Sequence, residues 1–245
     1  MCRLMGFVSP TEITIEDIAG ANFAEFSGLS EKHRDGWGIA TSPTGKPAEL
    51  IVETLPAKNS SRYSQLTSEA LSDGALLHLR WATSGLAVVE GNTHPFEYEN
   101  ISFIHNGGIT PLDSMDKFID EDLFKLMRGN TDSEKYFYLL ITQIRKKGLI
   151  DGIKSGVKLL RDNCNYSSIN AMVLTSDAYI IINEHDSVKR PKGEPEDYYE
   201  LSYRKDEKGI LVASSGWNQK NWTKIDNHKI LVIDRKSLGQ EILSI

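Results

Sequence analysis

The stretch Cys2-Arg3-Leu4-Met5-Gly6-Phe7-Val8 opens the chain directly behind Met1. A cysteine is small enough for methionine aminopeptidase to remove the residue before it. Cys2 would then carry a thiol and a free α-amine, whose ordinary pKa values are about 8.5 and about 7.7–8.0. Such a pair can act as a nucleophile with its own general base. On position alone, a buried cysteine in a strand over residues 3–8 is an equally good interpretation.

The composition indicates an ordinary globular protein. Of the 245 residues, 40% are hydrophobic and 25% are charged, as is typical of globular domains. The net charge of −6 argues against a nucleic-acid partner, which favours a basic surface. No apolar run approaches the roughly 20 residues of a membrane span, and the N-terminus lacks a signal-peptide pattern. Two distant cysteines do not indicate a disulfide framework, so we expect a cytoplasmic protein with reduced thiols.

The hydrophobic pattern predicts helices between early strands and a run of strands after residue 165. The clearest helix is expected over residues 131–146, where Thr131-Asp132-Ser133-Glu134 matches a capping box. The segment 185–197 is expected to be a long hairpin loop, because the residues after it would make a marginal domain alone. We therefore expect an α+β fold in one domain spanning residues 1–245. The main strands are expected over residues 3–8, 48–53, 75–80, 101–105, 169–174, 179–183, 199–203, 210–213 and 229–233.

Polar residues suited to chemistry follow two of these predicted strands. Arg80 ends the strand over residues 75–80, and an arginine there can hold a carboxylate with two parallel hydrogen bonds. Asn106 and Gly107 follow the strand over residues 101–105, and an Asn amide beside a glycine N–H can form an oxyanion hole. His94 precedes Pro95, which favours an extended backbone. Simpler interpretations are a surface arginine, a tight Asn-Gly turn and a loop histidine with a satisfied backbone partner.

The remaining candidate residues are weaker. Asp132 stands in the first turn of the predicted helix, where the helix dipole alone favours an acidic residue. Only its context makes it a candidate to bind an ammonium group. Cys164 has no obvious base beside it in the sequence, so we expect a structural role. The histidines at positions 33, 78, 94 and 105 show no metal-ligand spacing, and we expect neither a metal nor a cofactor.

Six short motifs over the first half of the chain together resemble the class II glutamine amidotransferases, members of the N-terminal-nucleophile hydrolase superfamily. The resemblance implies a four-layer αββα sandwich with Cys2 at its centre. The later strands fit that fold only loosely. In chain order, the motifs are C-x-x-x-G at Cys2–Gly6, D-G-W-G at Asp35–Gly38, R-W-A-T at Arg80–Thr83, N-x-H-P at Asn92–Pro95, H-N-G at His105–Gly107 and T-D-S-E at Thr131–Glu134.

The resemblance also implies the catalytic roles. Cys2 attacks the side-chain amide carbon of a γ-glutamyl group and forms a thioester. Its α-amine is the general base once Met1 is removed. The side-chain amide of Asn106 and the N–H of Gly107 stabilise the oxyanion.

The glutamyl pocket follows from the same resemblance. A zwitterionic amino-acid head needs one cation and one anion fixed on opposite sides. The resemblance implies that Arg80 holds the α-carboxylate and that Asp132 holds the α-ammonium. Atoms near Trp81, Thr83 and His94 complete the pocket.

Within this family the substrate and partner stay open. The best-known members fuse this domain to a synthase, whereas this sequence looks more like the stand-alone members. Those include the γ-glutamyl hydrolase of ergothioneine biosynthesis and the amidase component of a glutathione-degrading complex. We expect cleavage of glutamine or of a small γ-glutamyl compound. The alternatives are a glutaminase subunit that supplies ammonia to a separate synthase subunit, and a non-catalytic γ-glutamyl-binding regulatory subunit. Assembly into a homo-oligomer stays open.

Overall fold

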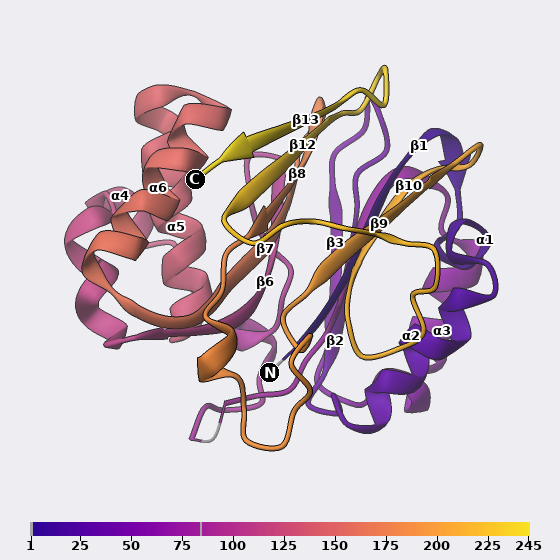
Figure 1. Cartoon of the computed structure of the whole chain (residues 1–245), viewed down its shortest axis with the longest axis horizontal. Coiled ribbons are helices and arrows are strands. Elements are labelled where there is room, and N and C mark those ends of the chain that lie inside the picture. Colours follow the sequence, from indigo (N-terminus) through magenta and orange to yellow (C-terminus); the bar gives the residue numbers. More distant parts are fainter. Residues whose placement is uncertain (1, 84) are drawn as a thin grey trace.

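The computed structural model describes residues 2–83 and 85–245, and it places two antiparallel sheets face to face (Figure 1). The expected removal of Met1 lies outside the described residues. The first sheet has the order β11-β9-β10-β1-β4-β2-β3, with β1 Arg3–Ile13, β2 Trp37–Thr41, β3 Glu49–Glu53, β4 Ser72–Leu79, β9 Leu201–Asp206, β10 Gly209–Ser214 and β11 Thr223–Lys224. The second sheet has the order β13-β12-β8-β7-β6-β5, with β5 Phe96–Tyr98, β6 Ile101–Thr110, β7 Asn165–Leu174, β8 Ala178–Asn183, β12 Lys229–Asp234 and β13 Gln240–Ser244.

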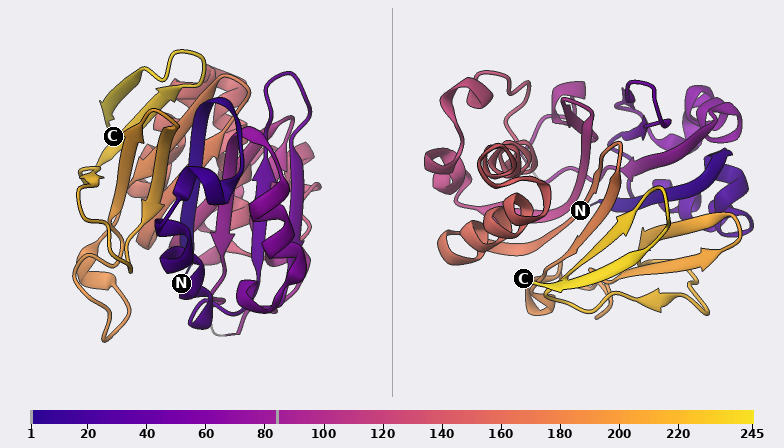
Figure 2. Two further views of the ribbon diagram at one scale, coloured as in Figure 1. Left: turned by 90° about the vertical axis from the view of Figure 1, so that its right-hand side faces the viewer. Right: turned by 90° about the horizontal axis from the view of Figure 1, so that it is seen from above.

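Helices cover the outer face of each sheet (Figure 2). The first sheet carries α1 Ile15–Ala19, α2 Asn22–Gly28 and α3 Ser61–Glu69, and the second carries α4 Glu121–Phe124, α5 Asp132–Lys147 and α6 Leu149–Asn163. Short 3-10 helices lie at η1 Leu29–Glu31, η2 Ala57–Asn59, η3 Glu90–Asn92, η4 Leu112–Phe118 and η5 Ser187–Lys189. The expected α+β class and four-layer αββα sandwich are therefore confirmed.

The alternation of side chains along β1 explains the layers. Successive residues of a strand point to opposite faces of its sheet. Leu4 and Val8 belong to the apolar core between the two sheets, whereas Met5 and Phe7 belong to the core beneath α1–α3. β1 is buried on both faces because it lies in the middle of its sheet. The start of β1 thereby brings Cys2 to one end of the inter-sheet layer.

The segment 185–197 is not a hairpin loop, so that prediction was wrong. β8 pairs with β7 and β12 in the second sheet, whereas β9 pairs with β10 and β11 in the first. The chain therefore crosses from one sheet to the other at the end of the sandwich where the N-terminus lies (Figure 1). We call residues 184–200 the crossing segment. Local sequence cannot distinguish a hairpin from a crossing, because both require only a polar connection between two strands.

The strand around His105 is longer than predicted. β6 continues through Asn106 and Gly107 to Thr110, paired with β7, with an irregularity in the register between Gly108 and Ile109. The turn interpretation of Asn-Gly is therefore wrong, because long-range pairing with β7 overrides the local turn preference. Other elements agree closely with expectation, such as the helix predicted over 131–146 and observed as α5. The short strands β5, β11 and β13 were not predicted.

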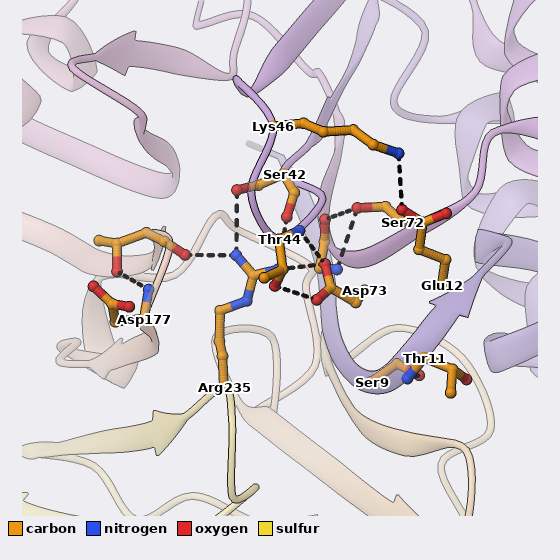
Figure 3. Close-up of polar contacts among 12 residues, drawn as sticks. Ser9, Thr11, Glu12, Ser42, Thr44, Lys46, Ser72, Asp73, Asp177 and Arg235 are labelled. Carbon is orange, nitrogen blue, oxygen red and sulfur yellow. Dashed lines mark hydrogen bonds and ion pairs between the residues drawn. The ribbon is translucent and has the colours of Figure 1, made fainter.

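At the opposite end of the sandwich, Arg235 ties the two sheets together (Figure 3). It follows β12 of the second sheet and is 6% exposed. Its Nη2 donates to the Ser42 carbonyl oxygen at 2.6 Å and to Asp73 Oδ1 at 2.7 Å, both in or beside the first sheet. Its Nη1 donates to the Thr175 carbonyl oxygen at 2.7 Å. This buried, charge-assisted network fixes how the sheets lie at the end remote from Cys2.

Candidate active site

Cys2 stands at the first position before β1 and is partly exposed. Its N–H donates to Asn106 Oδ1 at 2.8 Å, and its Sγ lies 3.9 Å from the carbonyl oxygen of Trp81. These contacts connect three segments that are far apart in sequence. Burial raises the pKa of the thiol, and the charge of Arg80 opposes that shift. The sulfur is therefore protonated at neutral pH and needs a base to become a nucleophile.

Asn106 is the residue that Cys2 contacts from the second sheet. It is 1% exposed, and its Nδ2 is buried without a hydrogen-bond partner in the described part of the chain. Since Cys2 N is a donor, the amide oxygen of Asn106 must face it, which fixes the amide orientation. Buried amide donors are rarely left unpaired. The free Nδ2 is therefore a donor available to a ligand beside Cys2.

Gly107 supplies a backbone donor next to Asn106. It pairs with Ile169 of β7, and Ile169 donates its own N–H to the Glu184 carbonyl oxygen on the β8 side at 2.9 Å. The pair is therefore of the non-hydrogen-bonded kind, and the Gly107 N–H points away from β7. A Cβ at this position would lie 1.8 Å from the Ser168 carbonyl oxygen, so only glycine fits.

Arg80 is held rigidly by backbone carbonyl groups. Its Nη2 donates to the Ala87 oxygen at 3.0 Å and its Nη1 to the Asp35 oxygen at 3.4 Å. It is 3% exposed, and within residues 2–83 and 85–245 no carboxylate forms an ion pair with it. Burial lowers its pKa, with opposing effects of Cys2 and Asp35, but an arginine stays charged. A buried cation without a carboxylate partner is suited to bind an anionic group.

Asp132 begins α5 and lines the same cleft as Arg80. Its Oδ2 accepts from Ile109 N at 2.7 Å, at the irregularity in β6, and its Oδ1 accepts from Ser133 N at 2.9 Å. These bonds hold the carboxylate in place and leave further lone pairs on each oxygen. Arg80 and Asp132 therefore present a fixed cation and a fixed anion to one cleft.

The cap of α5 is only half of the predicted capping box. Thr131 Oγ1 accepts from Glu134 N at 3.1 Å, as predicted. Glu134 does not reach back to Thr131. Its two oxygens accept instead from the N–H groups of Arg128 and Gly129, at 2.7 and 2.8 Å. Glu134 thus fixes the loop before α5, and Asn130 N in that loop donates to Asn92 Oδ1 at 3.0 Å.

Two buried histidines, His94 and His105, line the cleft, and a third, His78, packs against His94. The His94 ring lies 4.3 Å from that of His78, and neither of its nitrogens has a hydrogen-bond partner among the described residues. Burial lowers the pKa of both rings well below the ordinary value, so both are neutral at neutral pH. His105 Nε2 donates to the Ser168 carbonyl oxygen at 3.2 Å, and its Nδ1 accepts from Ser133 Oγ at 2.9 Å. Burial lowers the pKa of His105 too, with Asp132 opposing the shift.

The first-half motifs converge on this cleft. A Cβ on Gly38 would lie 2.0 Å from the His94 carbonyl oxygen, so the D-G-W-G motif allows β2 to pack against His94. Asp35 Oδ2 accepts from Ala82 N at 2.8 Å and orients the loop after Arg80. The cleft is lined by Cys2, Arg80, Trp81, Thr83, Leu86, Asn92, His94, His105, Gly107, Thr131, Asp132 and Ser133. Asn106 does not line the cleft but contacts Cys2, which does, so the structure brings all the predicted site residues together.

Several residues that line the cleft were not among the predicted site residues. Asn92, His105, Thr131 and Ser133 all lie inside the motifs quoted above, so the motifs held a signal for them. Leu86 lies in no motif. In the described part of the chain, no group of three or more His, Cys, Asp or Glu side chains is placed to hold a metal ion. No helix among residues 2–83 and 85–245 is long and apolar enough to cross a membrane.

Comparison with known proteins identifies related sequences and folds. Residues 1–175 match the family model described as "Glutamine amidotransferases class-II". A probable glutamine amidotransferase of Saccharomyces cerevisiae is 32% identical over 46% of this chain and 34% of its own length. A glutamine–fructose-6-phosphate aminotransferase of Bartonella quintana is 31% identical over 61% of this chain and 23% of its own. The chain thus spans about a third and about a quarter of these relatives.

A solved structure supports the same fold. A glutamine aminotransferase class-II domain protein from Silicibacter pomeroyi superposes with a TM-score of 0.70. The alignment covers 100% of this chain and 99% of that one at 17% identity. At that identity the likeness concerns the fold alone.

Proposed function

Since residues 1–175 match the family model, the chain belongs to the class II glutamine amidotransferases, and we propose that it hydrolyses the γ-glutamyl amide bond of glutamine or of a small γ-glutamyl compound through a Cys2 thioester. The observation that carries the proposal is the double role of Asn106. Its Oδ1 accepts from the nitrogen that would become the α-amine, and its buried Nδ2 has no partner in the described residues. One amide can therefore orient the base and stabilise the oxyanion.

The first half-reaction forms the thioester. With Met1 removed, the α-amine of Cys2 takes the thiol proton, and the sulfur attacks the γ-carbonyl carbon. The S–C bond forms while negative charge develops on the carbonyl oxygen, which Asn106 Nδ2 and Gly107 N–H stabilise. The C–N bond then breaks, and the leaving amine takes the proton from the α-ammonium. In the second half-reaction a water attacks the thioester, the S–C bond breaks, and the γ-carboxylate of glutamate forms as the thiol is restored.

The substrate head has a matching cleft. Arg80 can hold its α-carboxylate, because the guanidinium is buried and has no ion-pair partner within the described residues. Asp132 can accept from its α-ammonium with the lone pairs that Ile109 and Ser133 leave free. Trp81, Thr83 and His94 line the same cleft. Fixed groups of opposite charge select an amino-acid head over a simple acyl group.

Both sheets contribute to this site, which supports treating residues 1–245 as one domain. Cys2 precedes β1 and Arg80 follows β4 of the first sheet, whereas Asn106 lies in β6 of the second. We further propose that the protein works in the cytoplasm, where thiols stay reduced. The same thioester would serve a subunit that supplies ammonia to a separate synthase.

A product assay tests the proposal. The mature protein is incubated with glutamine and with γ-glutamyl peptides, and the release of ammonia, amine and glutamate is measured. We expect turnover of at least one substrate, its loss in Cys2→Ala and Cys2→Ser, and its retention in Cys164→Ser. Cys164 is a suitable control because its Sγ contacts Ser114 Oγ at 3.1 Å, outside the cleft. Full activity of Cys2→Ala would contradict the mechanism, and turnover of no substrate would favour a non-catalytic binding subunit.

A further inference from the structure

A second cavity lies at the Cys2 end of the second sheet, between β6, β7 and the crossing segment. Its volume is about 390 Å³, and it is lined by Gly108, Thr110, Asn165, Tyr166, Ser167 and Lys189. The crossing segment is anchored there, because Asp186 N donates to the Ser167 carbonyl oxygen at 2.9 Å and His185 forms a bridge with Ser168. The cavity therefore has a framework of backbone hydrogen bonds on its β7 side.

This cavity lies beside the proposed oxyanion site. Gly108 is two residues beyond Asn106 on β6, a distance of about 7 Å along the strand. Residues two apart in a strand lie on the same face of the sheet. Gly108 therefore lies on the same face of β6 as the Asn106 side chain, which contacts Cys2. Gly107 and His105 line the glutamyl cleft from the opposite face. A γ-carbonyl held at Gly107 would thus have its glutamyl head in one cavity and its leaving group directed toward the other.

The second cavity has one cation in its wall, and that cation is paired with a neighbouring carboxylate. Among its lining residues only Lys189 carries a charge at neutral pH. Lys189 Nζ lies 3.3 Å from the Tyr166 carbonyl oxygen and 3.4 Å from Asp186 Oδ2. The ion pair with Asp186 is solvent-exposed, with 52% and 38% of the side chains accessible. Exposed pairs contribute little, so a ligand carboxylate can replace Asp186 as the partner of Lys189.

We propose that this cavity receives the leaving group of the substrate and that Lys189 binds a terminal carboxylate on it. The substrate class is then a γ-glutamyl peptide with a free C-terminus. An extended chain advances about 3.3 Å per residue, so about two residues of a leaving group would span the roughly 7 Å from Asn106 to Gly108, where the cavity begins. This inference rests on the proposed function, because the same Cys2 thioester is formed whichever amine departs.

The test compares two γ-glutamyl peptides that differ in one charge. kcat/KM is measured for γ-Glu-Ala-Gly with a free carboxylate and for its C-terminal amide, and the acid-to-amide ratio is taken for each variant. We expect the wild-type protein to prefer the acid. Lys189→Met should lower the acid-to-amide ratio about two- to fivefold, the loss expected for a solvent-exposed ion pair. Both peptides are measured on the same protein, so a smaller fraction of folded protein lowers both kcat/KM values equally and leaves their ratio unchanged.

Matched variants complete the test. Lys192→Met is the control, because Lys192 is exposed in the same segment but does not line the cavity, and it should keep the wild-type ratio. Gly108→Ala should slow both peptides, because the added methyl group narrows the part of the cavity next to Asn106. It is expected to fold, because a Cβ there meets only Ser167 Oγ, at 3.6 Å.

The possible results separate this inference from the proposed function. An unchanged ratio in Lys189→Met, or a wild-type preference for the amide, would overturn the inference. Wild-type protein that hydrolyses glutamine but neither peptide would also overturn it and leave the proposed function standing. Turnover of neither glutamine nor either peptide would overturn both.

Discussion

Replacement of Asn106 is the most informative single change in this site. Asn106→Asp keeps an oxygen acceptor for Cys2 N and the shape of the side chain, but it replaces the Nδ2 donor with an oxygen that cannot donate to the oxyanion. Loss of one oxyanion donor lowers kcat by roughly 10²–10³, or about 2.7–4 kcal/mol. Asn106→Ala also removes the 2.8 Å hydrogen bond to Cys2 N, for which about 1 kcal/mol more is expected. KM should change little, because the oxyanion forms only in the transition state.

The assay is steady-state release of glutamate from the best γ-glutamyl substrate, with folding checked by thermal melting. Asn170 provides the control, because it faces Asn106 across the β6–β7 ladder and is also buried. Its Nδ2 donates to the Tyr199 carbonyl oxygen and its Oδ1 accepts from Glu184 N, so its role is structural. Asn170→Ala should destabilise the protein but keep kcat within about threefold per folded molecule. If Asn106→Asp kept more than a tenth of the wild-type kcat, the oxyanion assignment would be refuted.

Three further outcomes are expected. Asp132→Asn should raise KM about tenfold or more with a smaller change in kcat, because an amide has no negative charge to pair with the substrate ammonium. An unchanged KM in steady-state kinetics would contradict the role of Asp132 in binding the α-ammonium. The protein should lose stability below about pH 6.5, the ordinary His pKa, because burial lowers the folded-state pKa of His78, His94 and His105 and the unfolded chain then binds more protons. His78 and His94, whose pKa values lie well below the ordinary value, should each contribute about 1 kcal/mol between pH 6.5 and 5.5. Urea midpoints that do not move over this range would exclude this effect. Gly38→Ala should lower the free energy of unfolding by at least about 2 kcal/mol, because its Cβ would lie 2.0 Å from the His94 carbonyl oxygen. Gly28→Ala is the control in the same denaturation assay. It should be neutral or stabilising, because the space around Gly28 is open and its φ of −59° is helical.

Residue chemistry in short motifs was enough to predict which side chains meet. Cys2, Arg80, Asn106 and Asp132 were selected because a nucleophile, a cation, an amide and an anion appear in family order. Their surroundings were not predictable in the same way. Whether Asn106 Nδ2 is available to a substrate depends on the amide orientation that Cys2 N imposes, and that contact spans 104 positions in the sequence.

The two wrong predictions about the fold have the same cause, because each concerns contacts between residues that are far apart in the sequence. Asn-Gly at positions 106 and 107 favours a turn locally, but pairing with β7 keeps it in a strand. The crossing segment was predicted to be a hairpin loop because its polar sequence indicates a connection between two strands. The sequence does not indicate which sheet the second of those strands joins. The second cavity depends on that crossing, so no local pattern in the sequence indicated it.

The central claim is that Cys2 is an N-terminal nucleophile in the mature protein. The most direct test is the intact mass of the purified protein before and after incubation with a glutamine-mimicking electrophile. We predict a chain that lacks Met1 and gains one adduct, with the adduct absent in Cys2→Ala and present in Cys164→Ser. A chain that retains Met1 and stays unlabelled, or an adduct that persists in Cys2→Ala, would contradict the account.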